Sequence, residues 1–219
     1  MTTKVRFLDL AIKDLEERKA ILASVEQVLI HGMIIQGPEV EQLERKIAQR
    51  FGRKYAIGVS SGSDAVYLGL KGLGIGEGDE VITTSLCVSA PATAIAMTGA
   101  KPVFADVDNY MNIDPKSVRR LVTDKTKAIF LVHYAGRIGD IDALLELAKK
   151  YRLLILEDIS QAFGATKVDK TAGKIGDVSV LSINSMKILS GLGEAGMIFT
   201  DNISINNRIK NLHYNGMKD

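Results

Sequence analysis

The sequence predicts an α/β domain built on a seven-stranded, mostly parallel sheet flanked by helices. Two observations predict this fold class. Short apolar runs alternate along the chain with segments in which apolar residues recur at helical spacing, as in strands joined by crossover helices. The segment 153–156 is an unbroken aliphatic run, typical of a parallel strand that is covered on both faces. The seven expected strands lie at 54–59, 80–84, 101–105, 126–132, 153–156, 177–182 and 196–200.

Helices are expected between most of these strands. Pro38 suits the first turn of a helix, and Asp140 is a typical N-cap of a helix whose residues Ile141, Leu144, Leu145 and Ala148 face the core. The expected helices lie at 9–30, 38–51, 64–71, 91–97, 115–122 and from 141 on. The last two strands have no helix between them, so the seventh strand is expected to run antiparallel.

Length and charge limit the class of protein. At 219 residues the chain predicts one large domain, divided here into an N-terminal helical segment, 1–36, and a main domain, 37–219. The net charge is +2 with both signs interspersed, which gives no electrostatic reason to expect binding to nucleic acid or to a membrane. A single cysteine, Cys87, excludes an intrachain disulfide and suggests a small buried packing residue. With no signal region or spanning run apparent, a cytoplasmic protein is expected.

Polar residues gather where the predicted strands end. In open α/β sheets, ligands bind beyond the carboxyl ends of the strands, so side chains that follow different strands can meet there. The residues in these positions are Ser60–Ser63, His133, Asp158, Gln161, Ser182 and Lys187. Of these, His133 is expected to be structural rather than catalytic.

Two of these features have an ordinary alternative. The Ser-Gly turn at 60–63 precedes a helix, which favours anion binding, although a plain helix cap at Ser63 would produce the same pattern. Lys187 stands in a glycine-rich loop and is either a solvated surface residue or a reactive amine. The glycines at 74–78 and 191–196 precede strands rather than follow them, so a dinucleotide-binding motif is rejected.

The combination of lysine, acid and anion-binding turn fits pyridoxal phosphate. A lysine amine condenses with the aldehyde of this cofactor to form a Schiff base. Its phosphate needs backbone N–H groups and hydroxyls, and its pyridine nitrogen needs an acidic partner that keeps it protonated. Asp158, at the end of an aliphatic strand, suits the last role.

Four motifs resemble the DegT/DnrJ/EryC1/StrS aminotransferases. They are GPEVEQLE at 37–44, KYAIGVSSGSDAVYL at 54–68, LEDISQAFGA at 156–165, and S-x-x-x-x-K at 182–187 followed by GLGEAG at 191–196. The resemblance implies the large domain of a fold-type-I pyridoxal-phosphate enzyme. It also implies these roles: Lys187 forms the Schiff base, Asp158 pairs with the pyridine nitrogen, Gln161 contacts the ring face or its hydroxyl, and Gly62, Ser63 and Ser182 hold the phosphate.

The same resemblance implies a reaction and partners. An amino group would pass from glutamate or glutamine to the keto group of a nucleotide-linked sugar, in a homodimer. Family members continue into a smaller C-terminal domain, and they usually have a stacking aromatic where this chain has Val88. Two alternatives remain open: a truncated or degenerate domain without catalysis, and a sugar dehydratase of the same fold. Lys187 argues against the dehydratase, because those relatives typically have histidine at that position.

Overall fold

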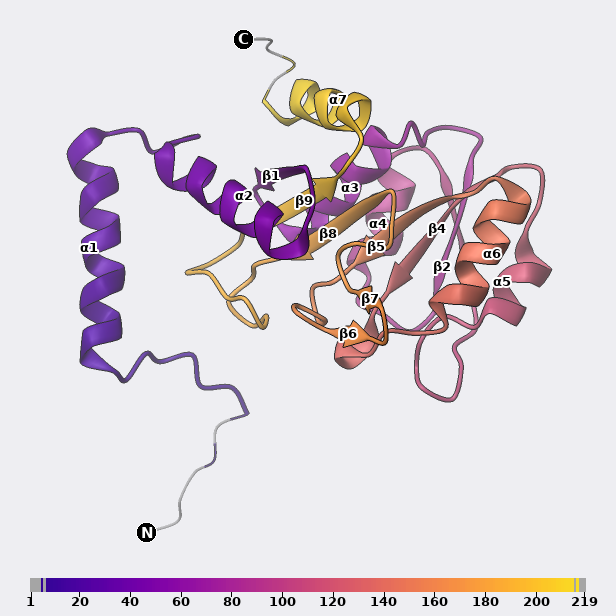
Figure 1. Ribbon diagram of the computed structural model, residues 1–219, viewed down its shortest axis with the longest axis horizontal. Coiled ribbons are helices and arrows are strands. Elements are labelled where there is room, and N and C mark those ends of the chain that lie inside the picture. Colours follow the sequence, from indigo (N-terminus) through magenta and orange to yellow (C-terminus); the bar gives the residue numbers. More distant parts are fainter. Residues whose placement is uncertain (1–4, 6, 215, 217–219) are drawn as a thin grey trace. The chain divides into compact units, whose positions relative to one another are not determined.

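The structure is a computed structural model that describes residues 5, 7–214 and 216 (Figure 1). The chain divides into two compact units, one up to Leu43 and one from Glu44 onward, and each is described by itself. The division predicted from the sequence, between 36 and 37, stays a prediction. Its two segments include residues 1–4, 6, 215 and 217–219, which lie outside the described part of the chain.

The first unit contains helix α1, Leu15–His31. The helix begins six residues later than predicted because Asp14 caps it, its side chain accepting a hydrogen bond from the Glu17 N–H at 2.7 Å. It ends at Gly32, whose φ of 73° is the left-handed conformation in which glycine commonly terminates helices. Helix α2, Pro38–Phe51, includes residues of both units and begins at the predicted proline.

The second unit is built on a seven-stranded sheet, as predicted. Its strands are β1 (Tyr55–Val59), β2 (Glu80–Thr84), β3 (Lys101–Ala105), β4 (Thr126–Val132), β5 (Leu154–Asp158), β8 (Val178–Ser182) and β9 (Gly196–Thr200). They lie in the order β1-β9-β8-β5-β4-β2-β3. Strand β9 is antiparallel to both its neighbours, which confirms the predicted direction, and the other pairs are parallel. The antiparallel strand lies inside the sheet, between β1 and β8.

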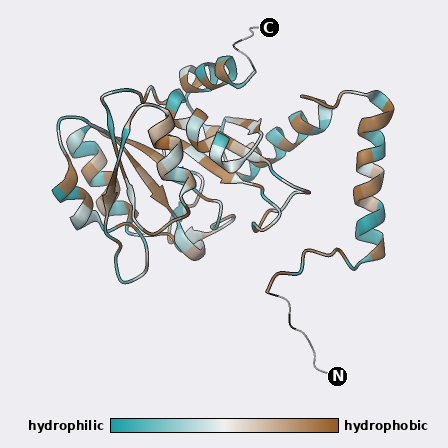
Figure 2. Cartoon of the chain, turned by 180° about the vertical axis from the view of Figure 1, so that it is seen from behind, coloured by the Kyte–Doolittle hydropathy of each residue, from teal (hydrophilic) through white to brown (hydrophobic). Residues whose placement is uncertain are grey.

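Helices cover both faces of this sheet (Figure 1). One face carries α3 (Gly62–Gly72), α4 (Ala90–Met97) and α7 (Ile203–His213), and the other carries α5 (Pro115–Leu121), α6 (Ile141–Tyr151) and the last turns of α2. Strand residues alternate between the two cores. In β4, for example, Phe130 packs on the α3 face and Ile129 on the α6 face. The strands accordingly appear mostly hydrophobic in Figure 2.

The structure corrects several expectations. Leu145 is 36% exposed and does not face the core, because α6 presents Ile141, Leu144 and Ala148 to the sheet. A small hairpin of β6 (Thr166–Lys167) and β7 (Lys170–Thr171), the turn η1 (Tyr134–Gly136) and α7 were not predicted. Two-residue strands carry too few residues for a periodic pattern. Among the described residues, no helix has both the length and the apolar character needed to cross a membrane.

Candidate functional site

One cavity of about 250 Å³ lies at the carboxyl ends of the strands. The six residues to which the resemblance assigns cofactor roles come from different elements, yet all of them line this cavity, whereas Ser60, Ser61 and His133 do not. The six are Gly62, Ser63, Asp158, Gln161, Ser182 and Lys187. The convergence follows from topology, because β5 and β8 are parallel neighbours and α3 begins beside the end of β8.

The N-terminus of α3 forms one side of the cavity. The helix starts at Gly62 and is capped by Ser61, whose hydroxyl accepts from the Asp64 N–H at 3.1 Å. The alternative that Ser63 is a plain cap is therefore wrong, and Ser63 instead stands in the first turn. A Cβ on Gly62 would lie 2.5 Å from the Cβ of Ser182, so only glycine allows this close approach to β8. The free N–H groups and positive dipole end of a helix N-terminus favour an anion.

Asp158 ends β5 and faces the same side of the sheet as α3. Leu156 packs in the core under α3, and two residues further along a strand the side chain points to the same face. The Asp158 carboxylate accepts the Ser160 N–H at 2.8 Å, and the Ser160 hydroxyl accepts the Ser182 N–H at 2.8 Å. Burial raises the pKa of Asp158, while the Ser160 hydrogen bonds and the positive charge of Lys187 act in the opposite direction. Such a carboxylate is poised to gain a cationic partner.

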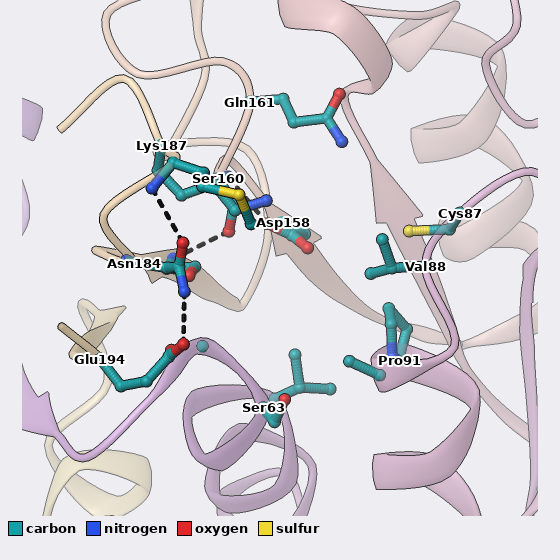
Figure 3. Close-up of a pocket in the computed structure, with 15 residues that line it drawn as sticks. Ser63, Cys87, Val88, Pro91, Asp158, Ser160, Gln161, Asn184, Lys187 and Glu194 are labelled. Atoms are coloured by element: carbon teal, nitrogen blue, oxygen red, sulfur yellow. Dashed lines mark hydrogen bonds between the residues drawn. The ribbon is translucent and has the colours of Figure 1, made fainter. Parts of the chain in front are cut away.

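Lys187 lies in a loop that Asn184 holds together (Figure 3). The Asn184 carbonyl accepts the Lys187 N–H at 2.8 Å, and its side-chain oxygen accepts the Met186 N–H at 2.9 Å. The Asn184 amide donates to the carboxylate of Glu194, across the loop. The half-buried lysine therefore belongs to an ordered turn at the cavity.

Sequence reasoning missed three of these supporting residues: Ser160, Asn184 and Glu194, all of which line the cavity. Asn184 left a usable signal, because asparagine just after a strand commonly accepts the N–H two residues on. No local sequence pattern indicates Ser160 or Glu194, because each has a hydrogen-bond partner that is distant in the sequence and meets it only in the folded chain. Gln161 was predicted, and its side-chain oxygen accepts the Ala135 N–H at 2.8 Å, which fixes it beside η1.

The opposite wall comes from the segment between β2 and α4 and from the first turn of α4. Cys87, Val88 and Pro91 line it and lie across the cavity from Asp158 and Lys187 (Figure 3). Val88 is 61% exposed. Cys87 packs against the core under α3, as expected of a packing residue, but it is only half-buried and also lines the cavity. Burial and the negative charge of Asp158 raise the pKa of the Cys87 thiol.

His133 is buried and is absent from the cavity lining. Its Nε2 atom lies 2.9 Å from the carboxylate of Glu157, a side chain that is fully buried. That His133 is structural rather than catalytic stays a prediction, and its position outside the cavity lining supports it.

The chemistry of the donor set fits pyridoxal phosphate. The cavity offers an amine, a carboxylate with a raised pKa and a helix N-terminus with hydroxyl neighbours. These are the groups that an aldehyde, a pyridine nitrogen and a phosphate require.

Comparison with known proteins gives a family. The sequence pattern described as the DegT/DnrJ/EryC1/StrS aminotransferase family matches residues 15–219. A UDP-2-acetamido-2-deoxy-3-oxo-D-glucuronate aminotransferase of Pseudomonas aeruginosa is 36% identical, over 97% of this chain and 59% of its own length. The chain spans about half to three fifths of the length of the curated relatives it matches.

Solved structures agree with this family. DesV of S. venezuelae, in complex with a ketimine intermediate, superposes with a TM-score of 0.95 and 37% identity, over 100% of this chain and 59% of DesV. NtdA of Bacillus subtilis, with bound cofactor PMP, gives a TM-score of 0.91 and 33% identity, over 98% of this chain and 49% of NtdA. The fold described above is therefore that of the aminotransferases of this family.

Proposed function

The chain belongs to the DegT/DnrJ/EryC1/StrS aminotransferase family, and on that premise we propose that it binds pyridoxal phosphate and transfers an amino group to a nucleotide-linked keto sugar. The observation that carries the proposal is the meeting of Lys187, Asp158 and the N-terminus of α3 at one cavity. The relatives support the substrate class, because several are named as aminotransferases or transaminases of UDP- or dTDP-linked sugars.

Three groups would hold the ring and its aldehyde. Lys187 supplies the amine that bonds to the aldehyde carbon. Asp158 pairs with the pyridine nitrogen and keeps it protonated, so that its own ionised form is favoured when the cofactor is present. Gln161 contacts the ring face or its hydroxyl, with its orientation set by the Ala135 N–H.

The phosphate would lie at the start of α3. Ser63 and Ser182 offer hydroxyls there, and Gly62 allows Ser182 to approach the first turn of the helix closely. Charge-assisted hydrogen bonds of this kind contribute about 1.5–3 kcal/mol each.

When bound, the cofactor supplies an electron-withdrawing ring that stabilises negative charge on the carbon next to the transferred nitrogen. The chain's own residues would do the rest. Asp158 holds the ring in its protonated, electron-withdrawing form. The Lys187 amine would serve as the group that accepts and donates the proton at that carbon. We propose glutamate or glutamine as the donor.

A reduction experiment tests cofactor binding. The purified chain is mixed with pyridoxal phosphate, treated with borohydride and digested, and the peptides are examined by mass spectrometry. The cofactor mass is expected on Lys187. Lys187→Ala should abolish the labelled peptide, and Lys150→Ala, on the exposed side of α6, is a control that should leave labelling unchanged. Wild-type chain that acquires neither visible absorbance nor label refutes the proposal.

Turnover separates the remaining alternatives. Amino transfer from glutamate or glutamine to a nucleotide keto sugar is expected, measured as formation of the amino sugar. Cofactor binding without any transfer would identify a domain without catalysis. Loss of water from the sugar in the presence of pyridoxamine phosphate, without net amine transfer, would identify a dehydratase.

A homodimer is part of the proposal. Helix α1 exposes apolar side chains, among them Leu22 at 67%, Leu29 at 66% and Ile30 at 71%, and such a surface favours association. Light scattering is expected to give twice the 23.8 kDa mass of the chain. Leu22→Glu combined with Leu29→Glu should lower the measured mass towards that of one chain. A wild-type chain that is already monomeric would contradict the proposed homodimer.

A further inference from the structure

Two neighbouring acids at the end of β5 have opposite surroundings. Asp158 faces the cavity, and Glu157, one residue earlier, points to the other face of the sheet. Burial raises the pKa of Asp158, and the Ser160 hydrogen bonds and the charge of Lys187 offset this only in part. Burial alone would also raise the pKa of Glu157, but the hydrogen bond and charge of His133 and the N–H groups of Gly173 and Gly176 lower it below its usual value. Glu157 is therefore ionised although it is fully buried.

Five donors surround the Glu157 carboxylate. Three come from the turn between β7 and β8, one from the following strand and one from the end of β4. They are the N–H groups of Gly173 (2.8 Å), Ile175 (3.0 Å) and Gly176 (3.1 Å), the hydroxyl of Ser179 (2.8 Å) and Nε2 of His133 (2.9 Å). A buried carboxylate with this many donors is fully hydrogen-bonded within the protein, so its role is structural and it needs no ligand.

Arg53 balances this charge from the other side of the same turn. Its guanidinium donates to the Gly173 and Gly176 carbonyls at 2.6 and 2.7 Å, and to the Ser179 hydroxyl at 2.9 Å. The Ser179 hydroxyl in turn donates to Glu157, so it bridges the two opposite charges. At the outer end, Arg53 pairs with Asp201 at 3.0 Å. The turn thus binds Glu157 through its N–H groups and Arg53 through its carbonyls.

His133 connects this network to Asp158. Its side chain contacts Glu157, and its backbone N–H donates to the Asp158 carbonyl at 3.2 Å. One residue at the end of β4 therefore holds both acids. The charge of a protonated His133 also favours the ionised form of Asp158.

We propose that Glu157 and His133 are positioning residues for Asp158, which hold β5 in the register that turns Asp158, and not Glu157, towards the pyridine nitrogen of the cofactor. The inference rests on the proposed function and extends it to residues outside the cavity. The physical reason is the period of two in a strand. A slip of β5 by one residue would exchange the faces of the two acids and leave the N–H groups of the buried turn without an acceptor.

The test measures cofactor binding in folded variants. Pyridoxal phosphate labelled with ¹⁵N at the pyridine nitrogen is titrated into wild type, His133→Gln and Glu157→Gln, and the dissociation constant and the ¹⁵N resonance are recorded. Both variants are expected to bind about tenfold more weakly or worse, the scale on which outer partners act at metal sites. Their resonance should move towards that of the unprotonated nitrogen. Circular dichroism checks the fold.

Asp201→Asn is the matched control. It removes a charge from the solvent-exposed end of the same network, where Asp201 contacts Arg53 and not His133 or Glu157. Its dissociation constant is expected within twofold of wild type and its ¹⁵N resonance unchanged.

Each outcome tests either the positioning role or the proposed function. Folded His133→Gln and Glu157→Gln chains that bind within twofold of wild type, with an unmoved resonance, overturn the positioning role. Failure of both variants to fold assigns the two residues to stability alone and also overturns it. Wild-type chain that binds no cofactor contradicts the proposed function instead, which keeps the two failures distinguishable.

Discussion

The two walls of the cavity are built on different principles. The wall formed by β5, β8 and the loop after β8 holds its polar groups in a hydrogen-bonded network, in which Ser160 joins Asp158 to Ser182 and Asn184 holds the backbone of Lys187. The wall formed by the segment after β2 and the first turn of α4 presents Cys87, Val88 and Pro91, without comparable side-chain hydrogen bonds among the described residues. The difference shows that the two walls have different tasks. One wall positions reactive groups, and the other offers an apolar surface to the face of a ring.

Asp158→Asn is expected to have the largest effect, because it removes the charge that the polar wall holds in place. Loss of one member of a buried charge pair costs on the order of 3 kcal/mol, which corresponds to roughly a hundredfold weaker cofactor binding. An absorbance titration measures it. Asp142→Asn, on the exposed side of α6, is the control, and equal affinities in the two variants would show that Asp158 does not contact the cofactor.

Gly62→Ala should come second, since it disturbs the junction of α3 with the polar wall. The added Cβ would lie 2.5 Å from the Ser182 Cβ, and overpacking of this kind destabilises by about 1–3 kcal/mol. Thermal unfolding is expected to shift down and cofactor affinity to fall. Gly76→Ala, whose Cβ would meet only the Thr98 carbonyl at 3.9 Å, should change neither. Equal stability of the two variants would mean that α3 does not need this close approach.

Val88→Phe should have a smaller effect of the opposite sign on binding, because it gives the apolar wall a ring that can stack. Aromatic pairs contribute about 0.5–1.5 kcal/mol beyond burial, so a few-fold tighter dissociation constant is expected. Val88→Leu supplies apolar surface without a ring and separates stacking from simple contact. If leucine tightens binding as much as phenylalanine, the wall acts through apolar area alone.

The smallest effect is expected at Cys87. Its raised pKa keeps the thiol protonated to higher pH than a free cysteine, so alkylation should be slow at pH 8 and should accelerate as the pH rises through that pKa. Pyridoxal phosphate in the cavity should slow it further. Because Cys87 is the one cysteine of the sequence, mass spectrometry of the whole chain gives the rate directly. Fast labelling at pH 8 that the cofactor does not affect would place the thiol outside the binding wall.

Much of the site could be predicted from the sequence, for a reason visible in single residues. Asp158 follows an unbroken aliphatic run by two residues, and the Ser-Gly turn at 60–63 lies where a strand is followed by a helix. These local patterns predict the end of the sheet to which each residue belongs. The apolar patterns likewise predicted all seven strands of the main sheet, and the lack of a helix between the last two strands predicted the antiparallel direction of β9. Hairpin β6/β7 and helix α7 were not predicted, because short or polar segments carry little periodic signal.

The sequence by itself determined the positions along the chain of the seven main strands and of the helices between them, and the residue types at the strand ends, because each depends on patterns within a few residues. Only the tertiary structure decided that Ser61 rather than Ser63 caps α3, that Cys87 faces the cavity, and that Glu157 is tied to Arg53 through Ser179. These depend on contacts between residues as far apart as 126 positions in the chain, as in the bond from Arg53 to Ser179. Burial then makes the geometry of such contacts decisive, since a charge removed from water is stable only where the fold supplies its partners.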